Sequence, residues 1–145
     1  MEQLMPGVHL TPLKIIEVEK GNVLHALKSS EESFNGFGEA YFSTVHTDTF
    51  KGWKMHQEMT LNIVVPVGII QFFFLHQAHD KGKISTATTV LSIENYQRLT
   101  VEPGIWIGFK GLGKELNLLL NIGSIPHNPS EALHAKPEVW MNYFE

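Results

Sequence analysis

The chain has 145 residues, 43% of them hydrophobic and none of them cysteine, and its formal net charge at pH 7 is -4. This length and apolar content allow one sizeable core, so we expect a single domain over residues 1–145. The absence of cysteine excludes disulfides and thiolate metal sites, and it is typical of a cytoplasmic protein. The lysines are scattered and Arg98 is the one arginine, which argues against a nucleic-acid partner. No segment approaches the ~20 apolar residues of a membrane span, so we expect no membrane partner.

Short apolar runs separated by glycine, asparagine and proline recur along the whole chain and predict strands. The predicted strands are 13–17, 39–45, 52–55, 60–66, 69–76, 88–92, 97–101, 105–110 and 115–122. One helix is expected over 21–33, because Val23, Leu24 and Leu27 fall on one helical face and Asn22 can cap its start. The pattern as a whole predicts an all-β, single-domain antiparallel jelly roll with at most short helices.

The C-terminal segment, 131–145, contains Trp140, Tyr143 and Phe144. This is too much aromatic surface to leave in water on a free tail. We therefore expect the segment to dock, either on its own domain or on a partner subunit.

The most polar cluster, FKGWKMHQE, lies directly before an apolar run that ends at Pro66. In an extended chain, alternation places Lys54 and His56 on one face and Trp53 and Met55 on the other. A lysine and an imidazole that share an interior pocket can exchange protons with a ligand or bind an anion. On a solvated edge the same two residues would have no such role.

Two longer runs, FGEAYFSTVHTDTFKGWKMHQEMTLNIVVPVGIIQF and LSIENYQRLTVEPGIWIGFKGLG, resemble the sugar-nucleotide epimerase branch of the cupin superfamily. That branch includes the dTDP-4-dehydrorhamnose 3,5-epimerases and their small relatives. The resemblance implies a cupin-like jelly roll, a homodimer and neither metal nor organic cofactor. It also implies epimerisation at C3, C5 or both of a nucleotide-linked 4-keto-6-deoxy sugar in surface-polysaccharide biosynthesis. In the family a histidine removes the protons, a lysine stabilises the enolate and a tyrosine returns a proton.

The family motif Arg-Gly-Leu-His falls on residues 51–54 of this chain, where the sequence departs from it. Lys51 replaces the arginine that contacts the substrate phosphates, and Lys54 replaces the histidine. The family's lysine falls on Leu61, and a further histidine falls on Ile107. The resemblance therefore implies acid–base roles for Lys54 and His56 and a phosphate contact for Lys51. The two vacant positions leave an alternative: a catalytically silent cupin that binds a sugar nucleotide or partners a pathway enzyme.

The same comparison argues against a metal site. The positions of the four ligands in metal-binding cupins are occupied here by Lys54, His56, Leu61 and Ile107. Only one of these four residues is a good ligand for a divalent transition metal. We expect no intrinsic metal.

Four further residues are candidates for substrate binding. Asn62 interrupts an apolar run, and a buried amide needs hydrogen-bond partners, from either the protein or a ligand. Trp106 could stack on a sugar or a base, or simply pack. His46, with Asp48 nearby, has the types of a histidine–carboxylate pair, although a turn also explains them. Tyr41 is a candidate because no tyrosine for the acid role is evident in the stretch NLLLNIGSIPH, residues 117–127, although Tyr41 and Tyr96 occur elsewhere in the chain.

Overall fold

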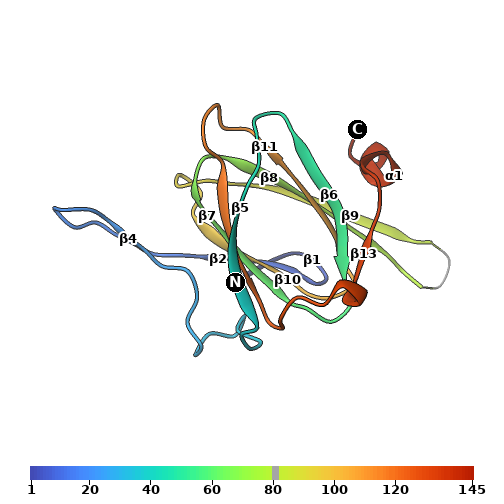
Figure 1. Ribbon diagram of the computed structural model, residues 1–145, viewed down its shortest axis with the longest axis horizontal. Helices are drawn as coiled ribbons and strands as arrows, with labels where there is room; N and C mark the ends of the chain where they lie inside the picture. Colours follow the sequence, from blue (N-terminus) through green and yellow to red (C-terminus); the bar gives the residue numbers. More distant parts are fainter. Residues whose placement is uncertain (80–81) are drawn as a thin grey trace.

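The computed structural model describes residues 1–79 and 82–145, and it contains two antiparallel sheets that face each other (Figure 1). The first sheet has the order β1 (Glu2–Met5), β2 (Val8–Pro12), β10 (Gln97–Val101), β7 (Leu61–Val67), β12 (Leu118–Gly123) and β5 (Glu39–Thr44). The second sheet has the order β13 (Ala132–His134), β6 (Phe50–His56), β11 (Trp106–Gly111), β8 (Ile70–Gln77) and β9 (Ile84–Leu91). A small hairpin of β3 (Ile15–Ile16) and β4 (Val23–Leu24) projects away from the sheets (Figure 1). The predicted all-β antiparallel jelly roll is confirmed.

The core lies between the two sheets and is built by strand alternation. Leu99 pairs in register with Ile63 across β10 and β7, and both side chains are buried in the core. On β8, Phe72 and Phe74 are fully buried in the same core, while Phe73 points to the outer face of the second sheet. Each fully buried phenylalanine stabilises the fold by about 1.5–3 kcal/mol relative to an exposed one.

The helix predicted for 21–33 is wrong. The segment contains β4 and then runs without regular structure across the outer face of the first sheet. Arg98, which is fully buried, holds it there by donating hydrogen bonds to the carbonyl of Ala26, the carboxylate of Glu31 and the hydroxyl of Ser33. Burial raises the pKa of Glu31, but the hydrogen bonds from Arg98 and from backbone N–H outweigh burial and lower it. These contacts outweigh the local helical pattern.

The helices are short: the 3-10 helices η1 (Pro129–Glu131) and η2 (Met141–Phe144), and α1 (Pro137–Trp140). Two of them, α1 and η2, lie in the C-terminal segment and pack on the outer face of the second sheet. Phe144 lies 5.6 Å from Trp53 and 5.3 Å from Phe73, measured between ring centroids. Trp53 also donates its indole N–H to the carbonyl of Pro137 at 3.0 Å. Across the described residues, no helix is long and apolar enough to cross a membrane.

Candidate active site

A cavity of about 410 Å³ opens where the edge strand of one sheet approaches the edge of the other. β5 forms the first edge, and β6 and β13 form the second. The cavity combines two lysines, an imidazole and a phenol with an apolar floor. Its lining includes Tyr41, Ser43, Lys51, Lys54, Ile107, Phe109 and His134.

Strand register brings an imidazole next to Lys54. Lys54 on β6 pairs with Ile107 on β11 and with His134 on β13. Residues paired across antiparallel strands point to the same face, with Cβ atoms about 4.5–5.5 Å apart. Since Ile107 belongs to the core, this face is the inner one. Lys54 and His134 are therefore neighbours on the wall of the cavity.

Lys51 is held at the rim of the cavity. Its Nζ donates hydrogen bonds to the hydroxyl of Ser43 at 3.1 Å and to the carbonyl of Thr44 at 3.0 Å. The same atom lies 5.6 Å from the centre of the Phe109 ring. These contacts fix a positive charge at an exposed position, where an anionic group of a ligand could reach it.

Tyr41 faces this wall from β5. Its hydroxyl oxygen accepts a hydrogen bond of 2.9 Å from the side-chain amide of Asn121 on β12. The phenol is 41% exposed, so it can meet a molecule bound in the cavity.

His56 lies in a different environment from Lys54. Alternation along β6 places it on the inner side, but it does not line the cavity, and it is buried against Glu131 with 2.8 Å between Nδ1 and Oε1. Burial raises the pKa of Glu131, but hydrogen bonds from His56 and from the backbone N–H groups of Glu58 and Met59 lower it to about 2. An ionised carboxylate only accepts hydrogen bonds, so Nδ1 of His56 carries the proton. The pair anchors the segment that leads into β13.

Two other candidates also lie outside the cavity. Asn62 lies beneath the segment held by Arg98, where its amide donates to the carbonyl of Ser33 and accepts from the hydroxyl of Thr100. Both ends of the amide are thus used by the fold. His46 is exposed in the connection between β5 and β6 and does not contribute to the cavity lining.

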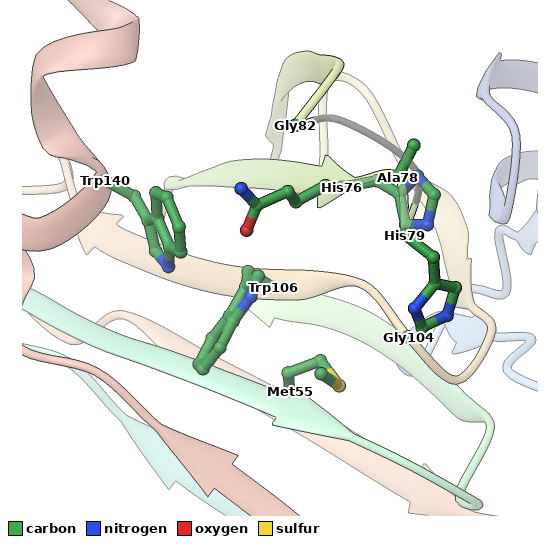
Figure 2. Close-up of a pocket in the computed structure, with 9 residues that line it drawn as sticks. Met55, His76, Ala78, His79, Gly82, Gly104, Trp106 and Trp140 are labelled. Carbon is green, nitrogen blue, oxygen red and sulfur yellow. The ribbon is translucent and has the colours of Figure 1, made fainter.

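Trp106 lines a separate pocket of about 450 Å³ on the outer face of the second sheet. It pairs in register with Met55. Because Met55 follows Lys54 along β6, its side chain points to the opposite, outer face of the sheet. Figure 2 shows Trp106 next to Trp140 of α1, with His79 across the pocket, and the two indole centroids are 6.0 Å apart. No lysine, arginine or carboxylate is found among the described residues that line this pocket. The inner cavity, with its two lysines, is therefore the better candidate for chemistry on an anionic ligand.

No group of three histidine, aspartate or glutamate side chains suited to a metal ion occurs within 1–79 and 82–145.

Comparison with known proteins identifies the family. A dTDP sugar isomerase from Desulfovibrio desulfuricans has a crystal structure that matches with a TM-score of 0.85 and 34% sequence identity, over 92% of this chain and 86% of that chain. This chain belongs to the dTDP-sugar isomerase family. A probable low-salt glycan biosynthesis epimerase from Haloferax volcanii is 25% identical over 81% of this chain and 79% of its own length. The dTDP-4-dehydrorhamnose 3,5-epimerase from Sulfolobus tokodaii shares the fold, with a TM-score of 0.76 and 22% identity over 94% of this chain and 81% of that one. No family model matches the sequence.

The resemblance to sugar-nucleotide epimerases is confirmed, and the structure shows how this dTDP-sugar isomerase relative departs from the motifs. Leu61 and Ile107, at the two vacant positions, are both buried in the core. The residue that joins Lys54 in the cavity is His134, which the sequence analysis missed. No local pattern marks His134, because only the pairing of β13 with β6 brings it to the cavity.

Proposed function

We propose that this protein is an isomerase that epimerises a dTDP-linked 4-keto-6-deoxy sugar at C3, C5 or both. The observation that carries this proposal is the grouping of an imidazole, an ammonium and a phenol in one cavity between the sheets. These are the three kinds of group that proton removal and return beside a ketone require.

Each residue has a distinct part in the proposed reaction. The imidazole of His134 takes the proton from the carbon beside the keto group, and the electron pair of that C–H bond moves to the keto oxygen. The ammonium of Lys54, adjacent on the same wall, stabilises the enolate oxygen. The phenol of Tyr41, which comes from the opposite sheet edge, gives its proton to the other face of the same carbon. Water then gives a proton to the phenolate of Tyr41 and takes the proton from the imidazolium of His134, so both groups are restored and the configuration of the carbon is inverted.

Lys51 is proposed to bind the diphosphate. It is fixed at the cavity rim by Ser43 and Thr44, so its charge is available to the nucleotide while the sugar occupies the interior. An ammonium beside a phosphate forms a charge-assisted hydrogen bond, which is stronger than a neutral one.

We further propose that the protein acts in the cytoplasm, in surface-glycan biosynthesis, as a homodimer. The name of the Haloferax volcanii relative supports the glycan pathway. Exposed apolar side chains support the homodimer: Phe42 is 65% exposed on the edge strand β5, and Ile16 and Val23 are exposed on the projecting hairpin. Sedimentation at twice the chain mass at micromolar concentration is expected, and a monomer mass would contradict the dimer.

The reaction is tested with dTDP-4-keto-6-deoxyglucose in deuterium oxide, followed by proton NMR at C3 and C5. We expect deuterium at one or both carbons. His134→Gln and Lys54→Met should each slow this incorporation by about 10²-fold or more. His46→Gln is the matched control, because His46 is exposed outside the cavity, and it should retain full activity. Unchanged incorporation in the His134 and Lys54 variants, or none by the unmodified protein with any 4-keto sugar nucleotide, would overturn the proposal.

A further inference from the structure

We infer that Asn121 is a positioning residue that directs the phenolic proton of Tyr41 into the cavity. The inference rests on the proposed function, because it concerns the step in which Tyr41 returns a proton to the substrate.

The position of Asn121 follows from strand register. On β12 it pairs with Tyr41 of β5 on one side and with Ile63 of β7 on the other. Ile63 belongs to the core, so all three side chains point to the inner face. Asn121 is only 6% exposed and lies behind the phenol, whereas Tyr41 lines the cavity.

The direction of the hydrogen bond determines where the phenolic proton points. The amide Nδ2 of Asn121 donates to the hydroxyl oxygen of Tyr41 at 2.9 Å. A phenol has one proton, and that proton cannot point back along a bond in which its own oxygen is the acceptor. The hydroxyl must therefore direct its proton to another acceptor, and the space that Tyr41 lines is the cavity.

The other buried asparagines, Asn62 and Asn117, differ from Asn121 because the protein satisfies both ends of their side-chain amides. Asn117 uses its amide nitrogen on the carbonyls of Val45 and Gly113, and its amide oxygen accepts from backbone N–H groups. Asn62 is likewise satisfied by the protein at both ends. For Asn121, the hydrogen bond to Tyr41 is the one side-chain hydrogen bond found among the described residues, and its buried Oδ1 has no partner.

An amide at this position is therefore poorly explained by stability. It interrupts an apolar strand, faces the core beside Ile63 and leaves a buried oxygen unsatisfied, which is unfavourable. Its one contact orients a cavity group. During proton return the O–H bond of Tyr41 breaks and a C–H bond forms at the enolate carbon. The amide N–H then stabilises the phenolate oxygen until water reprotonates it.

Two variants separate positioning from structure. Asn121→Leu removes the hydrogen bond, while Asn121→Asp keeps the shape but offers only acceptors, so that the phenol donates to residue 121 and turns its proton away from the cavity. With dTDP-4-keto-6-deoxyglucose in deuterium oxide, we measure the deuterium exchanged and the epimer formed. Exchange reports proton removal by His134, and epimer formation also needs Tyr41.

The expected result is a changed ratio of epimer to exchange. The ratio should fall about tenfold in Asn121→Leu and about 10²-fold in Asn121→Asp, within the range of a general acid's contribution. In a Tyr41→Phe background, Asn121→Leu should change the ratio no further. Asn62→Leu is the structural control, and it should lower both measurements in the same proportion.

The outcomes distinguish the inference from the proposed function. Normal exchange with an unchanged ratio in both Asn121 variants overturns the inference alone, as does a further fall of the ratio in the Tyr41→Phe background. No exchange by the unmodified protein overturns the proposed function and this inference with it. Calorimetric binding of dTDP at unmodified affinity shows that each variant is folded.

Discussion

The buried pair of Glu131 and His56 should make the stability of this protein depend on acidic pH. The carboxylate accepts hydrogen bonds from Nδ1 of His56 and from the backbone N–H groups of Glu58 and Met59, at 2.8 to 3.0 Å. All three partners favour the ionised form. Glu131→Gln replaces one acceptor oxygen by an NH₂ group, which then faces a donor and leaves it unsatisfied.

The magnitude follows from the pKa of Glu131, which the fold lowers from 4.5 to about 2. At about 1.36 kcal/mol per pH unit, this difference corresponds to about 3 kcal/mol of folding free energy. The carboxylate side chain is 2% exposed, so solvent does little to screen the contacts. Because the pKa of the folded state is the lower one, this stabilisation is complete above about pH 4.5 and is lost as the pH falls towards 2.

Urea unfolding followed by tryptophan fluorescence measures the effect. Glu131→Gln should lose about 3 kcal/mol at pH 7, and its deficit relative to the unmodified protein should shrink between pH 4.5 and pH 2. Glu58→Gln is the matched control, since Glu58 is exposed and contacts Glu131 through its backbone; it should change stability by less than about 0.5 kcal/mol. A deficit in Glu131→Gln that is below 0.5 kcal/mol, or that is the same at pH 7 and pH 2.5, would refute this reasoning.

Two further predictions test the outer faces of the sheets. Arg98→Met should destabilise the fold by about 3 kcal/mol, because it leaves Glu31 and the carbonyl of Ala26 without their donor. A protease should then cleave the variant first within 21–33. Resistance to the protease equal to that of the unmodified protein would contradict this prediction. Trp106→Ala should lower the free energy of unfolding by about 2 kcal/mol, because it removes the packing of Trp106 against Trp140. The rate of substrate deuterium exchange per folded molecule should stay unchanged. A loss of exchange beyond twofold would place Trp106 in the reaction after all.

Much of the fold could be predicted from the sequence because its strands carry their own signals. Runs such as those of β7 and β8 are rich in β-branched and aromatic residues and are bounded by turn residues. The strands that were missed, β1, β2, β4 and β13, are short, with two to five residues each. The prediction of a helix over 21–33 was wrong because this segment is held by Arg98, about 70 residues away in the sequence. No local pattern can include such a contact.

The candidate site could be predicted only in part, for the same physical reason. Alternation along one strand correctly separates the faces of Lys54 and Met55, since the period of two is local. The partner of Lys54 is set by strand pairing, and β13 brings His134 from 80 positions further along the chain. The contact between Asn121 and Tyr41 likewise depends on the register of β12 against β5. Which polar residues share a cavity is thus a property of topology.

Lys51 should contribute to nucleotide binding rather than to proton transfer. Its Nζ is held at the rim by Ser43 and Thr44, and it is exposed, so replacing it leaves no buried charge behind. One charge-assisted hydrogen bond to a phosphate is worth about 1.5–3 kcal/mol, so Lys51→Gln should weaken dTDP binding about tenfold or more. The maximal rate of exchange at saturating substrate should remain within about twofold, because a contact made equally in the ground and transition states affects KM alone.

Calorimetry with dTDP at two salt concentrations measures the binding, and the unmodified protein should show the steeper salt dependence. Lys114→Gln, which removes an exposed lysine that does not line the cavity, is the control for net charge. A fall in the maximal rate with unchanged dTDP affinity would move Lys51 from the phosphates to the reacting carbon.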